Sequence, residues 1–441
     1  MMTNAANGIR AACIGAALAL SLSTGGVLAA ELPEGFEVNK GNIDANLQNT
    51  FGGFSLRDLI TEKVEWQVRE HNLRLWLAPY KKIKLDPEYT KWSEINKSKV
   101  TFDPATRSIN GWEAGLPFPD LDANDPYCGD KAAWNLFYGP PIGTDLWAPV
   151  YVYLLIDGNK GLERVQGWAF FRYFVKGRWG TDQLVSGDPE IYHKSLIYAR
   201  EPFDIKGLGL FALKYDSPKL EDNWAYIRSF RRVRRLSGGA WMDPIGGTDQ
   251  LADDIEVFNA YPTWYPSYKC TGKRTVLATS NGRLQRWNDA ETDPVKRYPT
   301  VALDEAPYWN PKDDWQPTEV MVVEAQTPPE HPYSKKVMYM AIPYGRAFHA
   351  ETYDRKGEFW KFITFAQTII GPDTMGSVSN SWAGNRKNDG HYAMLSTQGV
   401  FIDFQRRHAT VFVTDESSLS NRVGIKDDEV TLQRLEQAAA R

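Results

Sequence analysis

Short apolar runs at roughly ten-residue spacing are the feature that most constrains this chain. From Ala148 onward, apolar and polar residues alternate in PVYVYLLIDGNKGLERVQGWAFFRYFV and in KSLIYAREPFDIKGLGLFALKYDSPKLEDNWAYIRSF. The pattern resumes in TEVMVVEAQTPPEHPYSKKVMYMAIPYGRAFHAETYDRKGEFWKFITFAQ. Turn signals such as Asp157-Gly158 separate the runs, which is typical of antiparallel hairpins. Because no long helical period lies between the runs, we expect a mainly β fold and not a parallel βαβ sheet.

Helical patterns lie mainly toward the two ends of the chain. SLRDLITEKVEWQVREHN has Ser55 as a possible N-cap and Leu56, Leu59 and Val64 at helical spacing, which predicts one amphipathic helix. CGDKAAWNLFY predicts a shorter helix, and DDEVTLQRLEQAAAR predicts a C-terminal one. Residues 85–130 are rich in proline and polar residues, so we expect an ordered but irregular arm there.

The first residues predict an export signal. Arg10 precedes the apolar run AACIGAALALSL, and STGGVLAA then supplies small residues for cleavage after Ala29 or Ala30. The run is too short to span a bilayer, so we expect a periplasmic protein that does not cross the membrane, with an outer-membrane association left open. The predicted parts are a signal peptide (1–29), an N-terminal helix and arm (30–147), a β core (148–415) and a C-terminal tail (416–441).

Charge and cysteine usage limit the partners and the chemistry. The net charge is −4, which disfavours nucleic acid as a partner. Cys128 and Cys270 remain after cleavage, and an oxidising compartment favours a disulfide between them over two buried free thiols. The sequence contains neither a CxxC pair nor an HExxH motif, so we predict no metal site and no cofactor.

A block of arginines, FRRVRRLSGG, stands out in this acidic chain. A guanidinium that points inward requires carboxylate or carbonyl partners. We therefore predict a structural ion-pair network that fixes the GGTDQLADD segment against the sheet; a headgroup contact at a cavity mouth and a phosphate site are the alternatives. Its members are Arg231, Arg232, Arg234, Arg235, Asp249, Asp253 and Asp254. If residues 224–236 form one strand, its mixed faces predict a bulge or a change of conformation near Arg231 and Arg232.

Aromatic residues are abundant and are spread along the chain. With 16 Trp, 21 Tyr and 20 Phe, they either build a thick β core or line a groove for an apolar or sugar ligand. Core packing is the more common role for any one of them. The candidate ligand-binding residues are Trp168, Phe170, Phe211, Trp224, Tyr226, Phe230, Trp241, Trp360 and Phe362.

Three blocks carry a resemblance to a known family. WAYIRSFRRVRRLSG is followed by GGTDQLADDIEVF, the arm contains GWEAGLPFP and DPYCGDKAAWN, and FIDFQRRHATVF lies near the end. In this order the blocks resemble exported outer-membrane lipoprotein-sorting proteins, and in particular a large subgroup known as a conserved domain of unknown function. The resemblance covers residues 56–412.

The resemblance implies a fold and a function. The fold is that of LolA and LolB: a strongly curved antiparallel sheet forming an open (half) barrel, with helices plugging the concave side around a hydrophobic cavity. Members of the subgroup are associated with transporters of the resistance-nodulation-division superfamily and with an outer-membrane protein. We therefore expect a periplasmic, non-enzymatic carrier or adaptor for an apolar small molecule or lipid.

Two other classes of function remain open. A secreted glycan-active enzyme needs two carboxylates, for which Asp249 with Asp253 or Glu351 with Asp354 are available. A cargo-free subunit of an envelope assembly would instead turn its aromatic residues toward a partner protein.

Overall fold

The computed structural model describes residues 29–227, 232–285, 290–372, 390–415, 417–420 and 425–440. Phe230, Arg231 and the predicted signal peptide except Ala29 lie outside these residues. Within them, no helix is long and apolar enough to cross a membrane.

One antiparallel sheet dominates the molecule, so the predicted mainly β fold is confirmed. From edge to edge its strands run β12, β11, β10, β9, β8, β7, β19, β18, β17, β16, β15, β14, β13. Their bounds are β7 Asp145–Asp157, β8 Gly161–Phe174, β9 Ile191–Glu201, β10 Gly209–Tyr215, β11 Asp222–Ile227, β12 Arg232–Arg235, β13 Ser267–Ala278, β14 Asp314–Gln326, β15 Lys335–Ala341, β16 Arg346–Tyr353, β17 Phe359–Ile370, β18 Ala393–Asp403 and β19 His408–Thr414.

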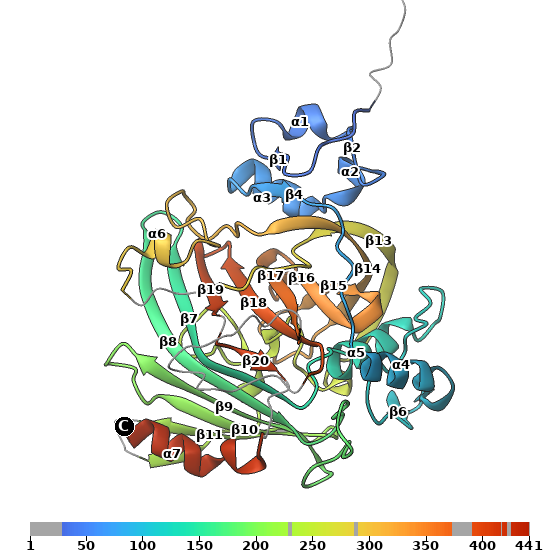
Figure 1. Cartoon of the computed structure of the whole chain (residues 1–441), viewed down its shortest axis with the longest axis vertical. Helices are drawn as coiled ribbons and strands as arrows, with labels where there is room; N and C mark the ends of the chain where they lie inside the picture. Colours follow the sequence, from blue (N-terminus) through green and yellow to red (C-terminus); the bar gives the residue numbers. More distant parts are fainter. Residues whose placement is uncertain are drawn as a thin grey trace, which may run out of the picture.

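The order of the strands creates a topological requirement. Two meanders, β7–β12 and β13–β19, meet where β19 pairs with β7. The strands β12 and β13 follow each other in the chain but lie at opposite edges of the sheet, and no pairing joins them in the described part of the chain. Figure 1 shows the sheet curving from β13 and β14 at the top to β10 and β11 at the bottom. Residues 236–266, called here the crossing segment, must connect the two edges.

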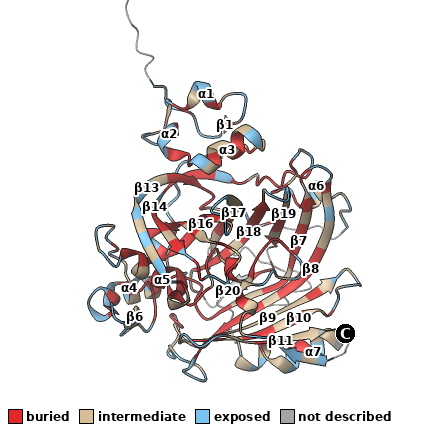
Figure 2. Ribbon diagram, turned by 180° about the vertical axis from the view of Figure 1, so that it is seen from behind, coloured by how far each residue is buried: buried red, intermediate tan, exposed pale blue. Residues whose placement is uncertain are grey.

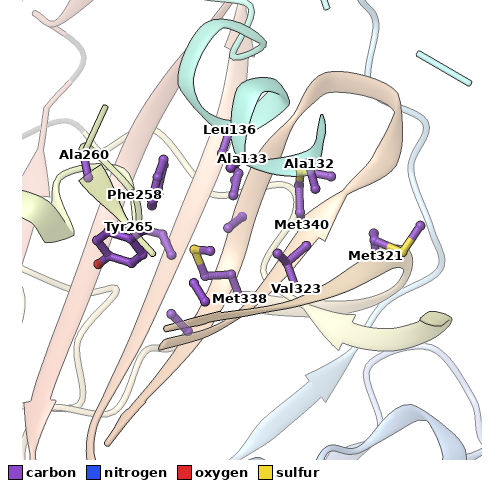
Figure 3. Close-up of a cluster of buried hydrophobic side chains, with 14 of the residues drawn as sticks. Ala132, Ala133, Leu136, Phe258, Ala260, Tyr265, Met321, Val323, Met338 and Met340 are labelled. Atoms are coloured by element: carbon purple, nitrogen blue, oxygen red, sulfur yellow. The ribbon is translucent and has the colours of Figure 1, made fainter. Parts of the chain in front are cut away.

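The two faces of the sheet are both apolar and are covered by different elements. In β8, Trp168 and Phe170 point to one face, whereas Phe171 and Tyr173 point to the other. The first is called the cavity face; it receives the crossing segment and helix α5 (Cys128–Tyr138). Figure 3 shows α5 above the methionines of β14 and β15, beside Phe258 and Tyr265 of the crossing segment.

Four coverings bury the opposite face and the ends of the strands. Helix α7 (Leu432–Ala440) packs on β9–β11, and residues 295–309 pack on β7 and β19. Helix α4 (Pro87–Lys99) shares an apolar cluster with side chains of β14 and β15. An N-terminal unit, residues 31–77, contacts β13, β14 and β17 (Figure 1). In Figure 2 the buried residues accordingly follow most of the strands, while exposed ones lie on the outer helices, on loops and along the edge strand β13.

The remaining elements are short. They are β1 Glu37–Val38, α1 Ile43–Asn46, β2 Thr50–Phe51, β3 Phe54–Ser55, α2 Leu56–Leu59, α3 Glu62–Glu70, β4 Leu75–Leu77, β5 Thr101–Asp103, β6 Ser108–Asn110, α6 Pro294–Arg297 and β20 Leu419–Ser420. The crossing segment contains three single turns, η2 Ala240–Met242, η3 Ala252–Asp254 and η4 Pro262–Trp264.

The helix predictions had mixed outcomes. The short helix of CGDKAAWNLFY is α5, and the C-terminal helix is α7. The single amphipathic helix is wrong: Ser55 does cap α2, but Thr61 then accepts a hydrogen bond from the Val64 amide and starts a separate helix, α3. The irregular arm is also wrong in part, because it contains α4, whose start is fixed by capping from Asp86 and by Pro87 at its first position.

Residues 224–236 do not form one bulged strand, because β11 ends at Ile227 and β12 begins at Arg232. Of the two alternatives, the bulge is therefore wrong, and the change of conformation falls partly outside the described residues. The chain reverses between β11 and β12, which pair in antiparallel register with Trp224 opposite Arg235. Arg232 and Arg234 therefore lie on an edge strand, where both are exposed.

A disulfide ties the helix on the cavity face to one edge of the sheet. Cys128 at the start of α5 is bonded to Cys270 of β13, across 142 residues of sequence. The backbones approach closely here, since a Cβ on Gly129 would lie 2.4 Å from the carbonyl carbon of Tyr268. The pairing predicted from the sequence is therefore present.

Removing this disulfide should weaken the fold. Because it closes a long loop, we expect the double variant Cys128→Ala/Cys270→Ala to lose about 2–5 kcal/mol of unfolding free energy. Guanidinium titration of the variant, of oxidised wild type and of reduced wild type measures the loss. A double variant as stable as oxidised wild type would contradict the expected loss.

Candidate functional site

The crossing segment lies on the cavity face and is held there by side chains of the strands. The amide of Asp249 donates to Thr410 Oγ1 at 2.9 Å, and Lys361 Nζ donates to the Asp249 carbonyl at 2.7 Å. Gly246, at φ +55°, lies against the Trp168 ring, where a Cβ would be only 2.9 Å from a ring carbon. Gly246 thus allows the segment to approach the sheet.

A cavity of about 80 Å³ lies between the crossing segment and the sheet. The strands contribute mainly apolar side chains, including Tyr151, Tyr153, Phe170, Ile197, Phe365 and Phe412. The crossing segment contributes Ile245, Gln250, Ile255 and Glu256. Glu256 is the single charged residue among those that line this cavity within the described chain.

Of the predicted ligand-binding aromatics, Phe170 lines this cavity. Trp168 lies next to it, in edge-on contact with Tyr153 at a centroid distance of 6.0 Å. Trp241 packs in the core against Trp264, and Trp360 packs edge-on against Tyr333.

Four other predicted ligand-binding residues lie away from this cavity. The register of β9–β11 turns Phe211, Trp224 and Tyr226 to the opposite face, in the cluster that α7 covers. Phe362 is buried beneath the N-terminal unit. Their neighbours along the strand, and not they, face the crossing segment.

A fully buried cluster around Lys336 holds the crossing segment to β15. Lys336 Nζ lies 2.9 Å from Asp253 Oδ2, 2.9 Å from Asp254 Oδ1 and 3.0 Å from the Val257 carbonyl. Tyr265 and Tyr333 donate their hydroxyls to Asp253 and Asp254, at 2.6 and 2.7 Å. Burial alone would lower the pKa of Lys336, but the two carboxylates raise it above its ordinary value.

The predicted arginine network is therefore wrong for Arg235, Asp253 and Asp254. Arg235 pairs with Asp222 of the neighbouring strand, and Asp253 and Asp254 pair with Lys336. The physical reason is their separation in space. The described arginines lie on the edge strand β12, whereas both aspartates lie over β15, near the opposite edge of the sheet.

The third acid of the predicted network, Asp249, binds a histidine instead. His408 Nδ1 lies 2.6 Å from Asp249 Oδ2, and its Nε2 lies 3.4 Å from Glu163. Thr410 also donates to Asp249 at 2.8 Å. The hydrogen bond to Asp249 raises the pKa of His408 above its ordinary value.

A second charged cluster lies at the polar end of the cavity, around Glu256. Arg346 Nη1 is 2.6 Å from Glu256 Oε2, and Arg172 Nη1 is 3.7 Å from the same oxygen. Burial opposes ionisation of Glu256, yet the two arginines hold its pKa below the ordinary value. A smaller hollow of about 20 Å³ adjoins Arg172, His193 and Glu256. Sequence reasoning missed both arginines, because each stands alone in a strand with no motif around it.

The carboxylate pairs considered for glycan cleavage are engaged elsewhere. Asp253 is fully buried against Lys336, and Glu351 accepts hydroxyls from Tyr339 and Tyr353, each at 2.9 Å. Asp354 caps the turn between β16 and β17 by accepting the amides of Lys356 and Glu358.

A wider hollow lies at the surface between the N-terminal unit and β14. It measures about 670 Å³ and is open to solvent. Phe54 and Tyr80 line it and are exposed by 43% and 47%, so its walls are partly apolar.

Comparison with known families identifies the family of this chain. The family model described as a protein of unknown function (DUF1329) matches residues 38–436. The chain belongs to this family. The family inferred from the three sequence blocks is thereby confirmed. Among curated proteins, none matches the chain.

Solved structures give more distant likenesses. A candidate outer membrane lipoprotein-sorting protein domain from Vibrio parahaemolyticus and a DUF1329 family protein from Desulfovibrio piger each share 15% identity, with 66% of this chain and 92% of theirs covered and a TM-score of 0.42. A LolA superfamily protein from Nitrosomonas europaea shares 11% identity, with 69% and 96% covered and a TM-score of 0.37. These likenesses are too distant to assign a ligand to this chain.

The Lys336 cluster should carry much more stability than the arginine block. Replacing Lys336 with Met leaves two buried carboxylates without their cation, so we expect a loss of about 3–5 kcal/mol of unfolding free energy. The exposed change Arg232→Lys should alter it by less than about 0.5 kcal/mol. Denaturant titrations of both variants measure these losses. A larger loss in Arg232→Lys than in Lys336→Met would contradict this assignment and favour the arginine network.

The His408 pair should make stability depend on pH in a defined direction. A raised folded-state pKa means that the stabilisation is fully present below about pH 6.5 and is lost as the pH rises through that raised pKa. The difference in unfolding free energy between wild type and His408→Asn should therefore shrink from about pH 6 to about pH 9. A difference that is constant or grows with pH contradicts the assignment.

Proposed function

We propose that this protein is an exported, non-enzymatic binding protein for an apolar molecule, held between the sheet and the crossing segment. The observation that carries the proposal is the cavity, because most of its lining is apolar and Glu256 is its single charged lining residue within the described chain. A ligand that fills the cavity recovers contacts that the side chains leave unmade.

The size of the cavity restricts how cargo enters. Ligand pockets commonly measure about 300–1,000 Å³, so the space seen here accepts only part of a lipid chain. A longer chain requires the crossing segment to move. That segment is suited to do so, because within the described residues side chains hold it and no ladder of backbone pairs joins it to the strands.

We propose further that the curved sheet works as an open barrel of the LolA/LolB type. The resemblance of the three sequence blocks supports this part, and it also suggests a transporter of the resistance-nodulation-division superfamily and an outer-membrane protein as partners. The leader predicted from residues 1–29 supports a periplasmic location.

The small volume also favours a second candidate, a cargo-free subunit of an envelope assembly. In that case the interior is packed for stability alone, and the protein acts through its surface. A glycosidase is disfavoured, since cleavage uses two carboxylates and the described lining of the cavity offers one.

Filling the cavity distinguishes these functions. Ala148 lines the cavity, so Ala148→Leu should place the added carbons in existing space and abolish binding of octan-1-ol, with little loss of stability. Ala169 of the same sheet faces the opposite way, and Ala169→Leu should destabilise the fold yet keep binding. Calorimetric titration measures both.

Two outcomes would contradict the proposed site. No binding of octan-1-ol by folded wild type would favour the cargo-free subunit. Binding that survives Ala148→Leu but is lost in Phe54→Ala/Tyr80→Ser would move the site to the surface hollow beside the N-terminal unit.

A further inference from the structure

Two buried arginines share one carboxylate at the polar end of the cavity. The side chains of Arg172 and Arg346 are 5% and 2% exposed, and Glu256 is the acid that each contacts. Arg346 also donates through Nη2 to Ser396 Oγ at 2.7 Å, and Arg172 donates through Nε to Ser195 Oγ at 3.2 Å. Arg346 Nε is buried without a hydrogen-bond partner among the described residues. The donors of the pair therefore exceed what Glu256 can satisfy.

The interior is polarised as a result. Around Glu256, two guanidinium groups face one carboxylate, whereas around Lys336 one ammonium group faces two carboxylates. His193, beside Arg172, adds no positive charge, because burial and the neighbouring cations keep its pKa well below the ordinary value. Lys214 of β10 is matched by Glu221 at 2.6 Å. The local positive excess thus lies next to the apolar cavity, and the negative excess lies in the closed core.

Glu256 is held in an unfavourable backbone conformation. Its φ is +58°, and that of Val257 is +76°, although neither is glycine and valine is β-branched. Such conformations persist only where surrounding contacts impose them, and here Lys336 binds the Val257 carbonyl.

We propose that the cavity accepts an amphiphile with a carboxylate headgroup, and that Glu256 occupies the headgroup position while the site is empty. The inference rests on the proposed function and adds the class of ligand. The apolar chain lies among Phe170, Ile197 and Phe412, and its carboxylate replaces that of Glu256 at Arg346 and Arg172. Arginine pairs of this kind suit a carboxylate because each fork offers parallel donors.

Ligands with the same chain length but different headgroups test which headgroup charge the site prefers. We compare octanoate, octan-1-ol and octylammonium by calorimetry at pH 7.5 on wild-type protein. Octylammonium should bind most weakly, since its charge meets the arginines. In Glu256→Gln the internal competitor is neutral, so the affinity for octanoate relative to octan-1-ol should rise by about tenfold. In Arg346→Gln or Arg172→Gln that ratio should fall.

The test needs a matched control at another buried glutamate, and some of its outcomes would contradict the proposal. Glu351→Gln changes a buried glutamate that binds two tyrosines away from the cavity, and it should leave the ratio unchanged. If octan-1-ol binds but the ratio does not respond to Glu256→Gln, or octylammonium binds as well as octanoate, the carboxylate inference is wrong and the proposed function stands. If none of the three ligands binds folded wild type, the proposed function fails with it.

Discussion

The structure depends on one requirement, which is that residues 236–266 must travel from one edge of the sheet to the other across a buried face. A backbone that makes no ladder with the strands still needs partners for its amides and carbonyls when it is buried. Thr410 and Lys361 serve Asp249, and Lys336 serves Val257 together with the acids of the η3 turn. Polar and charged side chains of the strands thus provide the hydrogen-bond partners that a neighbouring strand provides elsewhere in the sheet.

The same requirement creates the interior space. A segment of irregular turns cannot match the pleated face of the sheet as closely as a second sheet or a long helix does. The mismatch appears between β7–β9 and β17–β19, where small and aromatic side chains surround the cavity. At its end, Glu256 carries both the strained backbone and the contacts with Arg172 and Arg346. The crossing segment therefore covers the cavity and also supplies Glu256 at the charged end of that cavity.

Local signals predicted the elements well, and long-range signals predicted the site poorly. The Asp157-Gly158 hairpin, α5 and the Cys128–Cys270 pair follow from turn chemistry, helical spacing and compartment. Asp86 and Pro87 are cap signals that could have revealed α4. The lining residues were harder, because α7 covers the opposite face with apolar side chains. With both faces apolar, alternation cannot tell Phe170 from Phe211.

Charge pairing failed for a related reason. Nearness in sequence joined the arginines of β12 to Asp253 and Asp254, whereas the topology separates them and brings Lys336 from β15. Lys336, next to Lys335 at the start of β15, gives no sign of its partners until the crossing segment is placed. The Glu256 cluster is hidden in the same way, since its arginines come from β8 and β16.

Hydrogen exchange of the crossing segment tests the central claim most directly, which is that this segment is the movable cover of a ligand site. Its amides at Asp254 and Val257 bond within the segment, so they report on its opening. They should exchange through openings smaller than global unfolding, faster than the amides of β17 and β18, and octan-1-ol should slow them without affecting α7. Exchange of these amides only with global unfolding, unchanged by octan-1-ol, would contradict the account.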